Sequence, residues 1–259
     1  MRATTVCLSR GFWARSLDEF KRLSNIAFNL EGIKGPSGPL PLHDFHQAER
    51  LKECKVMSDA DMGGFSKAAL DHIPSSYDNP NGHAHFHGSI STALPPNRPE
   101  IQRSGYAGWR TLDRPPTIFG RAVWNIDMYT YLGMRIKSDG RAYLVNVQTE
   151  SVVPTDLHQH RLFAKRPGEW ETVYIKWNDF VRTNHGFVVE PQTEMLRQKV
   201  RSIGVGLTDR VPGVFDLFVE RIWATNNPRE GEGEDKHALE VKEGQLKNKQ
   251  GRHINWSDK

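Results

Sequence analysis

The chain has 259 residues, of which 37% are hydrophobic and 25% are charged, so it can bury a core but must also expose polar segments. Its 35 basic and 31 acidic residues give a formal net charge of +4, which is weak evidence for nucleic-acid binding and suits an anionic membrane surface equally well. No run of about eighteen apolar residues occurs, which argues against a membrane-spanning helix, and the two cysteines are too few for a disulfide framework.

The first seventeen residues contain three arginines and several hydroxyl side chains but no acidic residue, a composition typical of a mitochondrial presequence. Apolar residues then recur at helical spacing with basic residues on the flanks, which predicts a basic amphipathic helix. Such a helix either packs on its own domain or docks on a membrane surface or a partner. We assign residues 1–31 to this presequence-like segment and helix, and we favour docking. The expected partner-binding residues of the helix are Trp13, Leu17, Phe20 and Leu23.

Two further segments differ in composition from the middle of the chain. Residues 32–54 begin with GIKGPSGPLP, and Pro and Gly at this density predict a linker and lead-in. Residues 227–259 carry seven acidic and seven basic residues with few apolar ones. Such a segment gains too little from burial to offset its ordering entropy, so we expect a polar, flexible tail. The folded domain is therefore predicted to span residues 55–226.

Within that span the side chains alternate with a period of two, which predicts β-strands. Residues 132–136 and 143–147 each place three apolar side chains on one face, and the turn residues at 138–140 between them predict a hairpin. Further strands are predicted at residues 82–91, 106–112, 173–177, 203–207 and 215–219, and one short helix at 192–200. Many short strands without intervening βαβ helices predict an all-β sandwich or barrel.

Sequence motifs for nucleotide binding are incomplete. Residues 204–209, GVGLTD, begin like a dinucleotide fingerprint, but Asp209 replaces the third glycine and Pro212 stands where the phosphate-binding helix should develop. Neither a Walker loop nor a nucleophile elbow occurs. Because no carboxylate pair can be nominated for acid–base chemistry either, we predict no catalytic residue and no cofactor.

Three histidines alternate along one predicted strand, at His83, His85 and His87. Side chains on one face lie about 7 Å apart, so three consecutive imidazoles rarely converge on one zinc ion, although two can do so with a cross-strand carboxylate. We favour a strand with Ala84 and Phe86 pointing inward, the histidines pointing outward and no metal. His158 and His160 are similarly expected to be surface histidines in a loop, and most tryptophans of the β region are expected in the core.

Several short motifs follow one another along the chain. They are GYAGWR at residues 105–110, YLGMRIKSDGR at 131–141, WETV at 170–173, WNDF at 177–180, VEPQ at 189–192 and SIGVG at 202–206. Each motif is short, but their ordered series, from about residue 15 to residue 225, resembles the complex I intermediate-associated protein family.

The resemblance implies a jelly-roll, galactose-binding-like β-sandwich. It also implies a chaperone-like assembly factor, not an enzyme, that binds membrane-arm assembly intermediates of mitochondrial complex I together with other assembly factors. The expected location is the matrix side, peripheral to the inner membrane, with no nucleic acid. On a solvated sheet face, Arg135, Asn146 and Gln148 are candidate partner contacts, because their strand neighbours take the core. A carbohydrate-binding module that uses the same face is the alternative.

Overall fold

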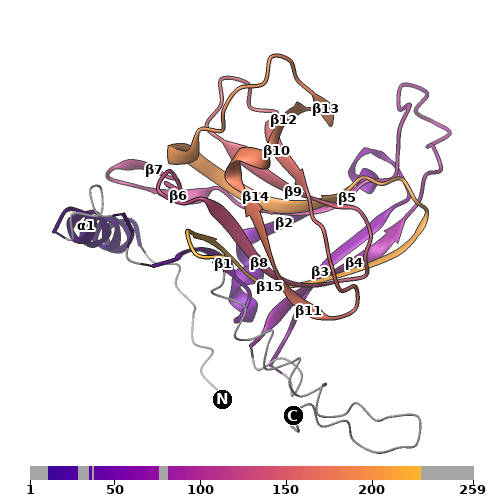
Figure 1. Cartoon of the computed structure of the whole chain (residues 1–259). Coiled ribbons are helices and arrows are strands. Elements are labelled where there is room, and N and C mark those ends of the chain that lie inside the picture. Colours follow the sequence, from indigo (N-terminus) through magenta and orange to yellow (C-terminus); the bar gives the residue numbers. More distant parts are fainter. Residues whose placement is uncertain (1–10, 29–34, 37, 76–80, 229–259) are drawn as a thin grey trace, which may run out of the picture.

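The computed structural model describes residues 11–28, 35–36, 38–75 and 81–228. Two antiparallel β-sheets lie face to face, and one helix stands to the side of them (Figure 1). The predicted presequence-like segment up to residue 10 and the predicted tail from residue 229 lie outside the described residues. The all-β sandwich expected from the sequence is confirmed.

The first sheet has six strands in the order β11-β8-β15-β4-β3, with β1 also paired to β15. The long strand β15 pairs with β8 on one side, and with β4 and then β1 on the other. The bounds are β1 (Leu40–Asp44), β3 (Lys67–Ile73), β4 (His83–Ile90), β8 (Tyr131–Ser138), β11 (Trp170–Lys176) and β15 (Gly213–Thr225).

The second sheet has seven strands in the order β13-β12-β10-β9-β14-β5-β2. Its bounds are β2 (Cys54–Ser58), β5 (Ala107–Thr111), β9 (Tyr143–Thr149), β10 (Asp156–Arg161), β12 (Val181–Asn184), β13 (Phe187–Val188) and β14 (Val200–Leu207). A separate hairpin pairs β6 (Arg114–Thr117) with β7 (Gly120–Ala122). Short 3-10 turns lie at η1 (Ala48–Glu53), η2 (Asp59–Met62), η3 (Trp177–Asp179) and η4 (Arg197–Lys199).

The core lies between the two sheets and is made by the alternation that the sequence shows. The alternating apolar residues of β8 and β9 are fully buried and face each other from opposite layers: Leu132, Met134 and Ile136 on β8, and Tyr143, Val145 and Val147 on β9. Ala84 and Phe86 of β4 point into the same core, as expected. Four of the tryptophans predicted to be core residues are buried as well: Trp109, Trp124, Trp177 and Trp223.

Three local expectations are wrong. β8 and β9 do not form a hairpin, because each pairs within a different sheet and the turn at 138–140 is a corner between the layers. A period of two shows which side chains face the core, but it does not show which strand lies alongside. The helix expected at 192–200 is reduced to η4, and β14 already begins at Val200. His158 is a buried residue of β10 rather than a surface residue in a loop.

The segment expected as a linker and lead-in contains part of the sheet. β1 pairs with the end of β15, with Leu40 opposite Ala224 and Asp44 opposite Arg221. Pro41 is compatible with this position because β1 lies at the margin of the sheet, where a missing backbone donor is tolerated. The sandwich therefore includes residues that precede the boundary predicted at residue 55.

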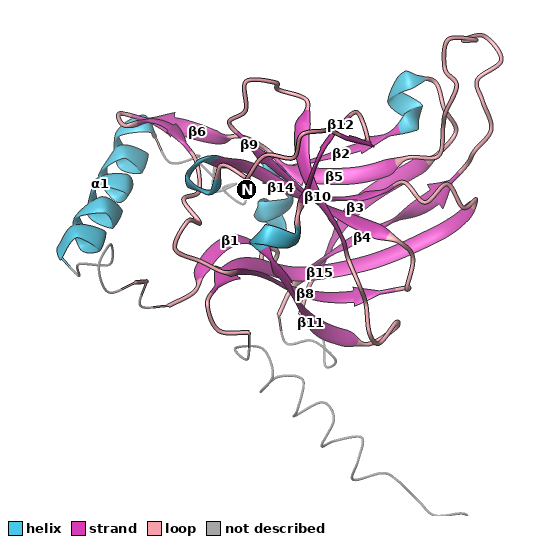
Figure 2. Ribbon diagram, turned by 45° about the horizontal axis from the view of Figure 1, so that its top comes forward, coloured by secondary structure: helices cyan, strands magenta, loops and turns pink. Residues whose placement is uncertain are grey.

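The helix α1 (Phe12–Phe28) lies outside the sandwich and next to the β6–β7 hairpin (Figure 2). Ser16 is its one buried residue. Within the part of the chain that the structure describes, no helix combines the length and apolar character needed to cross a bilayer.

Candidate functional site

The apolar residues predicted on α1 remain largely uncovered. Trp13 is 76% exposed, Phe20 56%, Leu17 54% and Leu23 40%. Large apolar side chains of a folded domain are normally scattered when they reach the surface, whereas a contiguous set marks an interaction site. The four residues expected to bind a partner thus lie together on one exposed helix, and Phe28 at its end is exposed as well.

Ser16 holds α1 against the β6–β7 hairpin. Its hydroxyl donates to the carbonyl of Phe12 at 2.8 Å and accepts from the backbone N–H of Ile118 at 3.1 Å. Arg15 adds a longer hydrogen bond to the carbonyl of Pro116, at 3.5 Å. Hydrogen bonds of Ser16 and Arg15 therefore attach the helix to the hairpin, while its large apolar side chains stay largely exposed.

The hairpin turn contributes two apolar residues that the sequence reasoning missed. Ile118 and Phe119 lie between β6 and β7 and are 54% and 51% exposed. The available signal in the sequence was Ile118-Phe119 directly before Gly120, since two large apolar residues beside a turn glycine are unusual in a solvated turn. The short strands on either side show no clear alternation, so the local pattern does not indicate a hairpin here.

The structure separates the candidate contacts on the sheets. Arg135 lies on β8, is buried and donates to Thr172 Oγ1 at 3.3 Å. Asn146 and Gln148 lie on β9 of the other sheet and are partly exposed, and Asn146 Oδ1 accepts a 2.7 Å hydrogen bond from Gln159. The expectation that all three share one sheet face is wrong, because β8 and β9 belong to different sheets.

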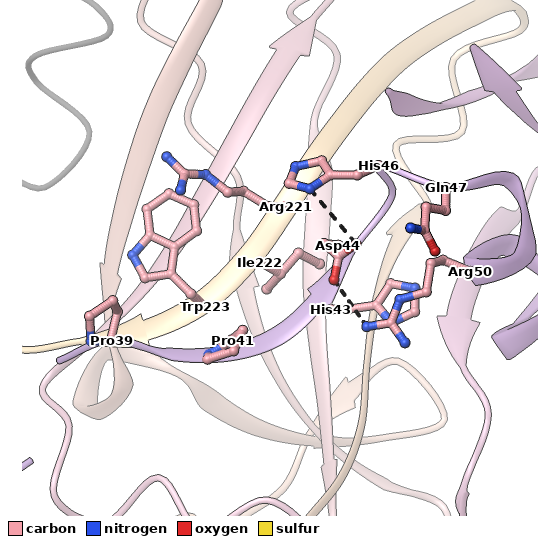
Figure 3. A pocket seen from close by; sticks show the side chains of 10 residues that line it. All are labelled: Pro39, Pro41, His43, Asp44, His46, Gln47, Arg50, Arg221, Ile222 and Trp223. Carbon is pink, nitrogen blue, oxygen red and sulfur yellow. Dashed lines mark hydrogen bonds and ion pairs between the residues drawn. The ribbon is translucent and has the colours of Figure 1, made fainter. Parts of the chain in front are cut away.

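An open pocket of about 770 Å³ lies over β1 and β15. Figure 3 shows Arg221 and Trp223 on one side of it and Gln47 and Arg50 on the other. The volume is in the range of small-molecule sites. The lining residues are Pro39, Pro41, His43, Asp44, His46, Gln47, Arg50, Arg221, Ile222 and Trp223.

Charged groups in this pocket are paired with one another. Arg50 donates to Asp44 at 3.0 Å and to Glu53 at 3.1 Å. Burial raises the pKa of Asp44, but the hydrogen bond and charge of Arg50 outweigh burial, so this pKa lies below its usual value. The guanidinium of Arg221 lies 4.7 Å from the ring centroid of Trp223, in cation–π geometry.

A cysteine and a histidine meet beneath the pocket. Cys54 Sγ lies 3.6 Å from His43 Nε2, a spacing that resembles a nucleophile and its base. Burial lowers the pKa of His43 to about 4, helped by the charge of Arg50, and burial raises the pKa of Cys54 to about 12. At neutral pH the pair therefore consists of a thiol and a neutral imidazole, whereas nucleophilic chemistry requires a thiolate.

The histidines of β4 are engaged on the outer side of their sheet. His85 contacts Asp216, and His87 lies 2.7 Å from Asp71 on the opposite neighbouring strand. His83 is buried beside Trp170, with ring centroids 5.0 Å apart. In the described ranges, no three His, Cys, Asp or Glu side chains come together in a group that could hold a metal ion.

Solved structures share this fold. The family 11 carbohydrate-binding module from Clostridium thermocellum, in complex with a β-1,3-1,4-mixed-linked tetrasaccharide, is similar with a TM-score of 0.50 and 16% identity, over 74% of this chain and 98% of the module. A second structure of a family 11 module, from the cellulosomal cellulase Lic26A-Cel5E of the same organism, gives a TM-score of 0.50 and 15% identity, over 74% of this chain and 97% of the module. At this level of identity the likeness concerns the fold alone, and it agrees with the galactose-binding-like sandwich expected from the resemblance.

Relatives with similar sequences carry one name. The protein named complex I intermediate-associated protein 30, mitochondrial, from Neurospora crassa is 55% identical, over 98% of this chain and 96% of its own length. Its namesake from Mus musculus is 25% identical, over 88% of this chain and 71% of the relative. The family model for complex I intermediate-associated protein 30 (CIA30) matches residues 43–219. The resemblance seen in the ordered motifs is therefore confirmed, and the chain belongs to the complex I intermediate-associated protein 30 family.

Proposed function

We propose that this protein is an assembly factor for mitochondrial respiratory complex I, which binds assembly intermediates of the membrane arm and acts without catalysis. The observation that carries the proposal is the 55% identity, over nearly the full length of both chains, to a protein named complex I intermediate-associated protein 30, mitochondrial. Because the match covers 98% of this chain, it includes both the sandwich and the N-terminal helix.

The surfaces of the molecule support a binding role. A cluster of exposed apolar residues on α1 is a feature of docking elements, whereas the His43–Cys54 pair is held in an unreactive protonation state. In this proposal Trp13, Leu17, Phe20 and Leu23 contact the partner. Asn146 and Gln148 form a secondary contact on the seven-stranded sheet, and the buried Arg135 supports its own sheet.

The proposed location is the matrix face of the inner membrane, with peripheral attachment and with other assembly factors beside the protein. The names of both relatives include the word mitochondrial. Peripheral attachment is supported by the exposed amphipathic helix. On this face of the membrane the protein meets the membrane-arm intermediates directly.

Deletion of the gene followed by native gel electrophoresis of mitochondrial membranes tests the proposal. We expect loss of mature complex I and accumulation of a stalled membrane-arm intermediate, with the other respiratory complexes unchanged. An affinity-tagged copy should restore complex I and co-purify with the intermediate rather than with the finished enzyme. Normal complex I in the deletion strain would refute the proposal.

A further inference from the structure

The helix α1 and the β6–β7 hairpin form one protruding unit, here called the arm and defined as residues 12–28 and 114–122. Figure 1 shows both elements beside the two sheets and not between them. Most residues of the hairpin strands are exposed, and α1 buries only Ser16. The arm therefore presents surface that the sandwich does not cover.

The apolar side chains of the arm form one continuous face. On an ideal helix with about 100° between residues, the large exposed apolar residues of α1 fall within an arc of about 160°. They are Phe12, Trp13, Leu17, Phe20, Leu23 and Phe28. Ser16 lies inside this arc, and its hydroxyl accepts the hydrogen bond from the backbone N–H of Ile118. The turn that carries Ile118 and Phe119 is thus attached at the apolar face of α1 and extends it.

The net charge of the arm favours an anionic bilayer over other occupants of this apolar face. The arm contains five basic and two acidic residues, a net charge of +3, and the charged residues of α1 lie outside the apolar arc. One of the acidic residues, Glu19, is already bound by Arg22 at 2.6 Å. An apolar face bordered by a basic surface is complementary to an anionic lipid surface, where each basic residue contributes about 1 kcal/mol. Trp and Phe are also the side chains that partition to the bilayer interface.

We infer that the arm is a lipid-binding element that lies in the surface of an anionic bilayer, with the hairpin turn inserted beside α1. The inference deepens the peripheral attachment proposed above, since it names the lipid surface and the residues that contact it. The sandwich is then held at the membrane through the hairpin, which follows β5 in the chain, and the Ser16 contact joins α1 to that hairpin. The pocket and the sheet faces remain free for protein partners.

Flotation of the purified full chain with vesicles tests the inference. Vesicles of pure phosphatidylcholine are compared with vesicles in which about a quarter of the lipid is phosphatidylglycerol. We expect binding to the anionic vesicles at least tenfold tighter than to the neutral ones, and weaker binding as salt is raised. Equal binding to both vesicles, or binding to neither, would overturn the inference.

Paired substitutions locate the contact. The pairs Trp13→Ser with Phe20→Ser and Ile118→Ser with Phe119→Ser should each weaken binding at least tenfold, because each removes two apolar side chains from the inserted face. Phe187→Ser with Val188→Ser removes an equally exposed apolar pair from β13 and should leave binding unchanged. Thermal unfolding that matches the unsubstituted chain shows that each variant is folded.

Quenching by lipids brominated on their acyl chains gives an independent readout. Trp13 is exposed, while Trp109, Trp124, Trp177 and Trp223 are buried, so quenching on vesicle binding should be much weaker in Trp13→Phe than in the unsubstituted chain. An unquenched Trp13 in the bound protein would contradict insertion.

The vesicle assay contains no complex I, so its outcome is separate from that of the gene deletion. If the hairpin variant binds vesicles normally but no longer co-purifies with the intermediate, the arm docks on protein and the lipid inference fails while the assembly function stands. If complex I is normal after gene deletion while vesicle binding still depends on the arm, the lipid inference stands and the proposed assembly function fails.

Discussion

Arg141 binds Asp209 through two hydrogen bonds, with Nε–Oδ2 at 3.0 Å and Nη2–Oδ1 at 2.7 Å, and both side chains are largely buried. The same guanidinium donates to the carbonyls of Gly213 and Val214, at 3.2 and 2.9 Å. The side chain of Arg141 therefore connects the corner after β8 to the loop that leads into β15. The acidic residue that breaks the dinucleotide fingerprint at residues 204–209 has a structural role in this clamp.

Removal of this clamp should destabilise the sandwich. Arg141→Gln leaves the Asp209 carboxylate without its cation and is expected to lower the free energy of unfolding by about 2–4 kcal/mol. Chemical denaturation measures the loss. In a double-mutant cycle with Asp209→Asn, the combined loss should be smaller than the two single losses added together. Strict additivity would contradict the direct pairing.

Acid should destabilise the protein through His43. Burial lowers the pKa of His43 in the folded state to about 4, whereas in the unfolded chain this pKa lies near its ordinary value of 6.5. The unfolded state therefore binds the proton more tightly, and stability falls as the pH drops from about 6.5 to about 4. Across this pH range, protonation of His43 lowers the free energy of unfolding by up to about 3 kcal/mol.

The pKa values of His83 and His158 are lowered by burial too and act in the same direction. Chemical denaturation of the unsubstituted chain and of His43→Asn across this pH window isolates the contribution of His43. The variant should show a shallower decline in stability. Parallel curves for the two proteins would assign the acid sensitivity to other groups.

Local patterns in the sequence predict the strands well but not how they pair. The alternation at 132–136 and 143–147 correctly identifies the buried side chains of β8 and β9. Their partners are β11, β15, β10 and β14, which lie elsewhere in the chain. Because a side-chain period of two is the same in every antiparallel arrangement, a corner between sheets and a hairpin have the same local pattern.

Composition is similarly ambiguous at β1 and at the arm. Prolines at 39 and 41 indicate a linker, yet β1 adds to the margin of the six-stranded sheet, where proline is tolerated. Helical spacing correctly predicts α1 and its exposed apolar residues. The contribution of Ile118 and Phe119 depends on the Ser16 contact, which joins residues about a hundred positions apart and has no local signal.

Gly133 is required by the packing of Trp223. These residues are paired across β8 and β15, and a methyl group added at Gly133 would overlap the indole. Because Trp223 is held between Arg221 and Tyr174, it has little room to move. Gly133→Ala should therefore lower the free energy of unfolding by about 1–3 kcal/mol. Gly38→Ala, which meets no neighbouring atom, is the matched control, and equal losses for the two variants would contradict this explanation.

Deletion of residues 12–30 should leave the sandwich folded. α1 is attached through Ser16 and Arg15 and contributes no residue to the apolar core, so its loss removes few stabilising contacts. We expect the midpoint of thermal unfolding to change by no more than a few degrees, while association with membranes or assembly intermediates is weakened. Calorimetry of the truncated chain, together with fractionation of mitochondria that carry it, measures both effects. Loss of cooperative unfolding would instead show that α1 stabilises the sandwich, because a helix that only docks on other surfaces can be removed without affecting the core.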